Sequence, residues 1–251
     1  AASDVYKRQI MSFILLQVFL ILSVLLGGLL VSYLNANYKR HTIKLTLAFS
    51  GGFLLAIVFC HLLPDLYQHD FETAGLYILI GFLLQLILEY FSGGIEHGHT
   101  DSKAGLSVPL TLFLALSIHS IIEGFPLGNV EGGHASHIGH GHGPLFWGIL
   151  FHQIPVAIAL MSLFVDSKMG MRKSWLFLIL FALTTPLGAV IGLYFNPEDI
   201  GLDVHVILAI VVGMFLHIST TIIFETSENH RINLLKLLCI LVGGVLAMFL
   251  S

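Results

Sequence analysis

The chain has 251 residues and a formal net charge of -4, and its composition is 56% hydrophobic and only 10% charged. Soluble domains have roughly 25% charged residues, so a water-soluble fold of this length could not cover its surface. The small net charge and the lack of a basic stripe exclude a nucleic-acid-binding protein. The only cysteines, Cys60 and Cys239, lie in apolar runs and form no disulfide framework. The composition therefore predicts a membrane-spanning protein.

The first nine residues need separate treatment. Residues 4–9 read D-V-Y-K-R-Q, which resembles the translation of a common sequencing-library adapter. We therefore expect residues 1–9 to be non-native. Residues 10–251 are predicted to form one membrane domain, because only short loops remain between their apolar stretches.

Apolar stretches of about 20 residues, each able to cross a bilayer as a helix, recur along the whole chain. We place eight of them, at residues 10–34, 45–66, 73–92, 106–127, 145–165, 174–195, 204–224 and 232–250. Transmembrane strands would need alternating polar and apolar residues, and residues 76–88 do not alternate. Glycine pairs inside spans would let helices pack closely; they are Gly27-Gly28, Gly51-Gly52 and Gly243-Gly244. The predicted fold class is an all-α integral membrane protein with eight transmembrane helices.

The basic residues indicate an orientation. Of the eleven Lys and Arg, Lys7 and Arg8 belong to the adapter-like stretch, and all the others follow odd-numbered spans. The loops after the second, fourth and sixth spans carry acidic residues instead. The positive-inside rule then places the odd-to-even loops in the cytoplasm and both termini outside.

Ionisable residues at membrane depth are costly and mark candidate functional sites. The second span ends outside with His61 and Asp65, four residues apart. They would either gather cations at an external entrance or form a plain solvated helix end. In the third span, Gln85 and Glu89 share one face, and we assign them no role beyond helix pairing.

The fourth and fifth spans carry the main candidate site. His119 and Glu123 share one helix face, with Ser120 at its edge, and His152 and Gln153 lie at mid-depth in the next span. Two imidazoles and a carboxylate make a three-ligand site that suits Zn²⁺ or a similar metal and leaves one position for exchange. A single intramembrane histidine is often only hydrogen-bonded to a neighbour. The three together favour a metal site, because a buried carboxylate needs a partner.

Two further groups of polar residues are candidates for metal handling. His217 in the seventh span and Glu225 at its inner end could pass a cation to the cytoplasm, or could be interfacial residues. The glycine-rich external loop between the fourth and fifth spans packs four histidines into nine residues: His134, His137, His140 and His142. Such a loop is typical of low-affinity metal capture, although a neutral linker is an alternative.

With these residues in view, the chain resembles the ZIP (Zrt/Irt-like protein) family of metal transporters over about residues 11–251. Three signatures of that family are matched: H-[SND]-x-x-[ED]-G at residues 119–124, H-L-L-P-[DE] at residues 61–65 and T-P-x-G at residues 185–188. The resemblance implies eight spans with both termini outside. It also implies metal transport without ATP, by one helix bundle moving against another, commonly within a homodimer.

The fifth-span signature departs from the family pattern. Family members commonly show H-E-x-P-H-E, whereas residues 152–157 read H-Q-I-P-V-A. Members with two metals complete the second site with carboxylates from the fifth and sixth spans, and Gln153, Val156 and Thr185 lack that charge. The resemblance therefore implies a single metal held by His119, Glu123 and His152.

The predicted function is import of a divalent transition metal into the cytoplasm, with zinc as first candidate and iron, manganese and cadmium as others. No cofactor besides the transported metal is expected. The expected partners are the metal ion, the lipid bilayer and a second copy in a homodimer. The expected location is a cell membrane, in particular a bacterial inner membrane. A metal exporter with histidine-rich loops is one alternative. An intramembrane metallohydrolase is another, although the chain has no H-E-x-x-H motif and is not predicted to be an enzyme.

Overall fold

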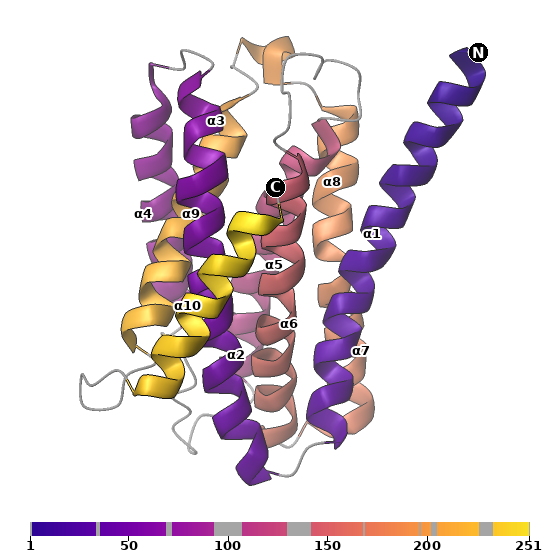
Figure 1. The fold of residues 1–251 in the computed structure, drawn as a ribbon. Coiled ribbons are helices and arrows are strands. Elements are labelled where there is room, and N and C mark those ends of the chain that lie inside the picture. Colours follow the sequence, from indigo (N-terminus) through magenta and orange to yellow (C-terminus); the bar gives the residue numbers. More distant parts are fainter. Residues whose placement is uncertain are drawn as a thin grey trace.

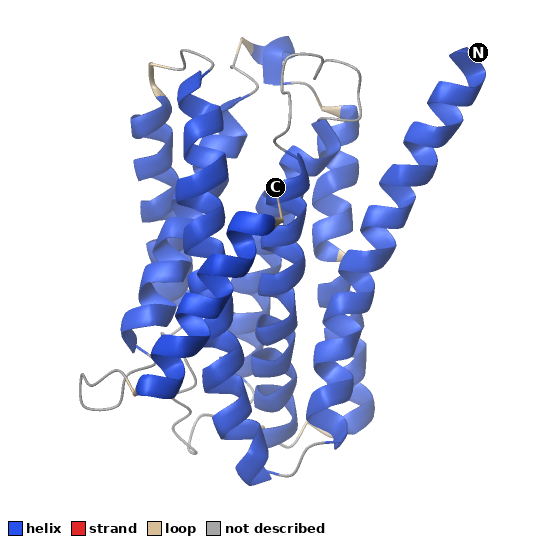
Figure 2. Cartoon of the chain, viewed as in Figure 1, coloured by secondary structure: helices blue, strands red, loops and turns tan. Residues whose placement is uncertain are grey.

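The computed structural model describes residues 2–33, 36–68, 72–92, 107–129, 142–167, 169–195, 197–201, 205–225 and 233–250. Regular structure in these ranges is entirely helical, without a strand (Figure 2). In the same ranges, seven segments are long and apolar enough to cross a membrane, and the apolar helix Leu234–Phe249 is shorter. The predicted all-α membrane fold is therefore confirmed.

The helices run side by side as one bundle, and the N-terminal part of α1 leans away from it (Figure 1). In chain order they are α1 (Ala2–Tyr33), α2 (Ala36–Ile57), α3 (Leu63–Gln68), α4 (Ala74–Ser92), α5 (Ser107–Asn129), α6 (His142–Asp166), α7 (Met171–Ala182), α8 (Thr184–Tyr194), α9 (His205–Glu225) and α10 (Leu234–Phe249). A π-helical turn, Val58–Leu62, joins α2 to α3, and a 3₁₀ turn, Pro197–Ile200, precedes α9. Because α1 begins at Ala2, it includes all of the adapter-like residues 4–9, whose non-native origin stays a prediction.

The sixth span is interrupted, which differs from the single helix expected there. Leu183 separates α7 from α8, and its backbone N–H bonds to the carbonyls of Leu180 and Phe181. Pro186 follows three residues later, and proline has no N–H to bond the carbonyl four residues back. The interruption places Thr185 in the first turn of a new helix, with its side chain buried at 1% exposure.

Reciprocal glycine contacts lock helices together in pairs. A Cβ added to Gly124 of α5 would lie 2.2 Å from the carbonyl oxygen of Thr185 in α8. A Cβ added to Gly188 of α8 would lie 2.0 Å from the carbonyl oxygen of Ile121 in α5. The pairs α2/α10 and α4/α9 show the same reciprocity, through Gly52 with Gly243 and Gly81 with Gly213. The expected close packing at Gly52 and Gly243 is thus confirmed. These contacts fix the helices on which the polar residues of the next section stand.

Among the described residues, the centre of the bundle is largely apolar, and its buried polar side chains include a cluster around His119, Glu123 and His152. Phe53, Ile57 and Phe215 are fully buried between helices, while leucines and phenylalanines on the outer faces of α1, α4 and α10 are exposed. An apolar exterior suits a lipid environment, where burying a hydrophobic side chain brings no gain over exposing it. The polar cluster therefore requires an explanation of its own.

Candidate metal site

The predicted ligands of α5 lie at the polar cluster. His119, Ser120 and Glu123 are 2%, 2% and 1% exposed. Helical spacing brings His119 Nε2 to 3.1 Å from Glu123 Oε2. Two ligands about 2.0–2.1 Å from a tetrahedral zinc ion lie about 3.3 Å apart. The observed separation therefore matches two groups that share one metal.

The histidine of α6 faces the same region. His152 is 2% exposed, and its ring centroid lies 6.1 Å from that of His119 at an interplanar angle of 78°. Both rings pack near Phe215 of α9, whose ring centroid lies 6.5 Å from the His119 centroid and 6.4 Å from the His152 centroid. The structure thus places the three predicted ligands together, at the junction of α5, α6 and α9.

The three side chains are not yet assembled around a common point. Among the described residues, no three His, Cys, Asp or Glu side chains lie close enough together to hold a metal as placed. His119 and Glu123 already have the spacing of joint ligands, so His152 is the member of the set that would have to come closer.

Neutral donors hold one oxygen of Glu123. Its Oε1 accepts hydrogen bonds from the hydroxyl of Ser120 at 3.2 Å, the amide of Gln153 at 3.4 Å and the hydroxyl of Thr185 at 3.4 Å. Gln153 Nε2 also donates to Thr185, and Ser23 of α1 donates to Gln153 Oε1 at 3.3 Å. Uncharged groups therefore orient the carboxylate through Oε1, while its Oε2 faces His119 Nε2.

Two contacts to the imidazoles were not predicted from the sequence. Gln85 of α4 places Oε1 at 3.0 Å from His119 Nδ1, and Ser50 of α2 lies 3.3 Å from His152 Nδ1. An amide in an otherwise apolar span was a usable signal for Gln85, to which only helix pairing was assigned. Ser50 carried no such signal, because serine is common in membrane helices.

The predicted exit residue His217 pairs with α4. Its Nε2 contacts Glu89 Oε2, and the two side chains are 7% and 12% exposed. Glu225 lies eight residues further along α9, about 12 Å at the rise of a helix, and its side chain is outside the described residues. The helix pairing expected for Glu89 is therefore made with His217. Glu89 itself lies one helical turn along α4 from Gln85.

The predicted external residues stand apart from this cluster. His61 lies in the π-helical turn, and its Nε2 contacts the Ala247 carbonyl oxygen of α10 at 3.2 Å. Asp65 follows in α3 and is half-buried. The capture loop lies outside the described residues at 134–140, as does the side chain of His142.

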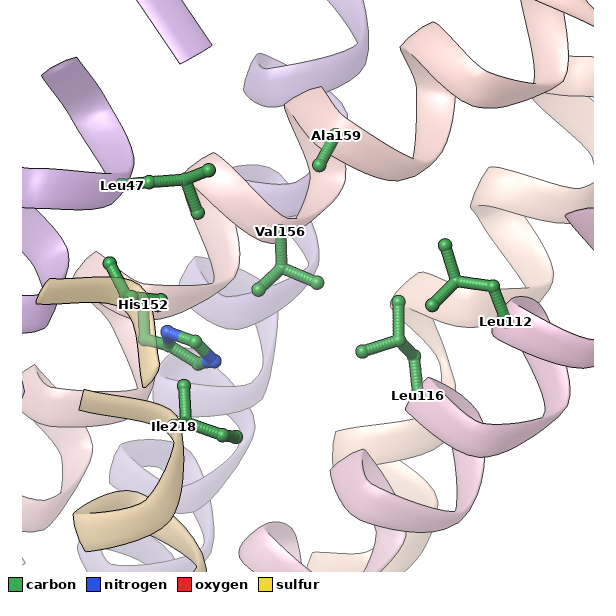
Figure 3. Close-up of a pocket in the computed structure, with 8 residues that line it drawn as sticks. Leu47, Leu112, Leu116, His152, Val156, Ala159 and Ile218 are labelled. Carbon is green, nitrogen blue, oxygen red and sulfur yellow. The ribbon is translucent and has the colours of Figure 1, made fainter. Parts of the chain in front are cut away.

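An apolar pocket adjoins His152 on one side. Figure 3 shows the imidazole at its margin and Val156 one turn further along α6. The rest of the lining is apolar and consists of Leu47, Leu112, Leu116, Ala159, Ile218 and Ile222. A cation that moved from the site toward the N-terminal end of α5 would meet no further ligand in this pocket.

Apolar helices around a buried cluster of histidine, carboxylate and amide groups define a polytopic membrane protein with a polar site at mid-depth. Residues 96–251 match the family model described as ZIP Zinc transporter, and since this is more than half of the chain, the chain belongs to that family.

Individual relatives are distant. The chain is 27% identical to Zinc transporter ZIP3 of Homo sapiens, over 88% of this chain and 90% of the relative, and 25% identical to its Bos taurus counterpart over the same shares. It is 26% identical to Probable zinc transporter 12 of Arabidopsis thaliana, over 56% of this chain. The match spans only 54% of that relative, and 64% of Zinc transporter 3 of the same plant.

Proposed function

We propose that this protein moves a divalent transition-metal ion, zinc first, across a cell membrane into the cytoplasm, and that His119, Glu123 and His152 bind the ion on its way. One observation carries the proposal. Within the described part of the chain, His152 Nε2 is buried without a hydrogen-bond partner, and His119 Nε2 and Glu123 Oε2 have no partner beyond their 3.1 Å contact with each other. A buried polar atom left unpaired costs about 1–3 kcal/mol. A cation bound between them would satisfy all three.

The hydrogen bonds around Glu123 support one metal at a time. Gln153 and Thr185 stand where a second metal would need carboxylates, and both donate toward Glu123 Oε1. Both groups are uncharged and direct hydrogens at Glu123, so they supply no negative charge for a second ion. The single negative charge then compensates half of the charge of one divalent ion, and the neutral imidazoles supply the remaining bonds.

The flanking residues fit an entrance and an exit. His61 and Asp65 lie toward the loops predicted to be external, while the Glu89 and His217 pair lies one turn of α4 further inward than Gln85. The apolar lining of the pocket offers no ligand to an ion on the direct inward route past His152. A change in helix packing would be needed to bring the ion to Glu89, in keeping with the bundle movement implied by the family resemblance.

The alternatives have less support. Membership in a family of zinc transporters argues against the hydrolase, which would also need a spare general base where Gln153 stands. No described contact favours export over import. A homodimer and a bacterial inner membrane stay proposals, and the relatives named above come from mammals and a plant.

Uptake into vesicles tests the proposal. The purified protein is reconstituted into liposomes that contain an impermeant zinc-sensitive dye. Zinc entry should be saturable, and excess cadmium, iron or manganese should inhibit it to different extents. Protein-free liposomes provide the baseline. If zinc equilibrates at the baseline rate across a range of gradients, the transport proposal is wrong.

Cysteine accessibility tests the direction. With Cys60 and Cys239 changed to Ser, a cysteine at Ser167 should be shielded from an impermeant thiol reagent in intact cells, and one at Ser136 should react. The positive-inside rule places Ser167 in the cytoplasm and Ser136 outside. Permeabilised cells, in which both should react, provide the control. The reverse pattern in intact cells would overturn the orientation and the inward direction.

The external histidines are expected to affect capture and not the transport step. Changing His134, His137, His140 and His142 together to Ser should raise the half-saturating zinc concentration severalfold and leave the maximal rate largely intact. A flexible loop raises the local metal concentration without adding an obligatory ligand. Uptake kinetics at equal surface expression measure both constants, and complete loss of uptake would show that the loop belongs to the pathway.

A further inference from the structure

A buried glutamine on α4 contacts the proposed metal site from outside the ligand set. Gln85 is fully buried, and its Oε1 lies 3.0 Å from His119 Nδ1. Gly81, one turn earlier, lies against the backbone of α9, where an added Cβ would be 2.0 Å from the Ile210 carbonyl oxygen. The position of Gln85 is therefore fixed by backbone packing as well as by its own contact.

The contact determines which nitrogen of His119 carries hydrogen. An amide oxygen can only accept, so His119 Nδ1 must donate. In the neutral imidazole this leaves the lone pair on Nε2, the nitrogen that lies 3.1 Å from Glu123 Oε2. Two lone-pair atoms facing one another at that distance repel unless a proton or a metal ion lies between them. The hydrogen bond that His119 Nδ1 donates to Gln85 Oε1 thus selects the tautomer that a metal requires.

We propose that Gln85 is a positioning residue that holds His119 in its metal-binding tautomer and orientation and thereby raises the affinity of the site. The inference rests on the proposed function, because it needs a metal at His119. Ser50 contacts His152 at the equivalent nitrogen. Its hydroxyl can either donate or accept, so it orients the ring without selecting a tautomer.

Two substitutions separate this role from plain packing. Gln85→Met keeps the length of the side chain and removes the acceptor, and it should raise the zinc dissociation constant of the purified protein by about 10–100-fold. Gln85→Glu keeps an acceptor at the same place and should restore zinc affinity to within a few-fold of wild type or tighten it, because a carboxylate makes the imidazole a stronger ligand. A packing role alone predicts the opposite order, since Glu introduces a charge into a buried site.

Gln17 of α1 provides a matched control. It is also a buried glutamine, 8% exposed, and neither polar atom of its side chain has a hydrogen-bond partner among the described residues. Gln17→Met should leave the zinc dissociation constant unchanged. Isothermal titration of zinc into detergent-solubilised protein measures all four proteins.

Nitrogen NMR of ¹⁵N-histidine-labelled protein reports the tautomer directly, with the His119 signal assigned by its loss in His119→Ala. Metal-free wild type should show hydrogen on Nδ1, and Gln85→Met should lose this preference. Hydrogen on Nε2 in the wild type would overturn the inference even if no Gln85 variant folds. Unchanged affinity in Gln85→Met, beside normal zinc binding by wild type, would overturn this inference alone. If wild type binds no zinc, the proposed function fails as well.

Discussion

Glu123→Gln is expected to abolish metal uptake while the protein remains folded. Glu123 is the carboxylate of the candidate site, since Gln153 and Thr185 around it are uncharged. Two unit charges 4 Å apart interact by about 4 kcal/mol at an effective dielectric constant of 20, which is about three powers of ten in affinity. A divalent ion in direct contact with the carboxylate would lose more affinity when this charge is removed. The amide keeps the shape of the side chain and its ability to accept from Ser120, so folding should be little affected.

Zinc uptake into proteoliposomes, with thermal unfolding in detergent as the measure of folding, tests this expectation. His119→Ala and His152→Ala should weaken uptake severely, because each removes one neutral ligand but leaves the charge. Glu89→Gln is the matched control, because it makes the same substitution at a carboxylate that pairs with His217 outside the candidate site. It should slow uptake without abolishing binding. Near-normal transport by Glu123→Gln would show that the site is wrong and make Glu89 the next candidate.

The shared face of two candidate ligands could be predicted from the sequence because it depends on local geometry, while their role in metal binding stays a proposal. A helix places residues four apart on one face, and a hydrophobic span places them at membrane depth, so His119 and Glu123 needed no tertiary information. The His152 contribution followed from the expectation that a buried carboxylate needs partners.

The contacts of α4 could not be predicted in this way. Gln85 and Glu89 lie one turn apart on one face, yet they pair with His119 of α5 and His217 of α9 respectively. Which helix meets which face depends on packing between segments far apart in sequence, and eight hydrophobic spans allow many arrangements. The interruption at Leu183 had a local signal in Pro186, but proline is tolerated inside α5 and α6 without ending either helix.

The glycine pairs carry the information on packing that the hydrophobic pattern lacks. Gly124 and Gly188 each lie against a backbone carbonyl of the opposite helix, so α5 and α8 touch along their backbones beside the site. Gly124 directly follows Glu123, and Thr185 precedes Gly188 by one turn. The distance between these helices therefore decides whether the hydroxyl of Thr185 reaches the carboxylate of Glu123.

Gly188→Ala is accordingly expected to destabilise the protein by about 3 kcal/mol, the upper end of the cost of overpacking, and to impair uptake. The added Cβ would lie 2.0 Å from the Ile121 carbonyl oxygen, where contacts under 3.0 Å essentially never occur. The obstacle is backbone, which cannot rotate away as a side chain can. The helices α5 and α8 must then separate, and the 3.4 Å contact between Thr185 and Glu123 is lost.

Gly148→Ala makes the same change inside α6, where the nearest atom to the added Cβ is the Ile57 methyl carbon at 3.5 Å, an ordinary contact. Removing a glycine from a helix interior without a clash is neutral or stabilising by up to about 1 kcal/mol. The midpoint of thermal unfolding in detergent and the rate of zinc uptake are measured on both variants. Both values should be at or above those of wild type for Gly148→Ala and well below them for Gly188→Ala. Equal stability of the two variants would show that α5 and α8 do not meet through their backbones, and the alignment of Thr185 with Glu123 would need another cause.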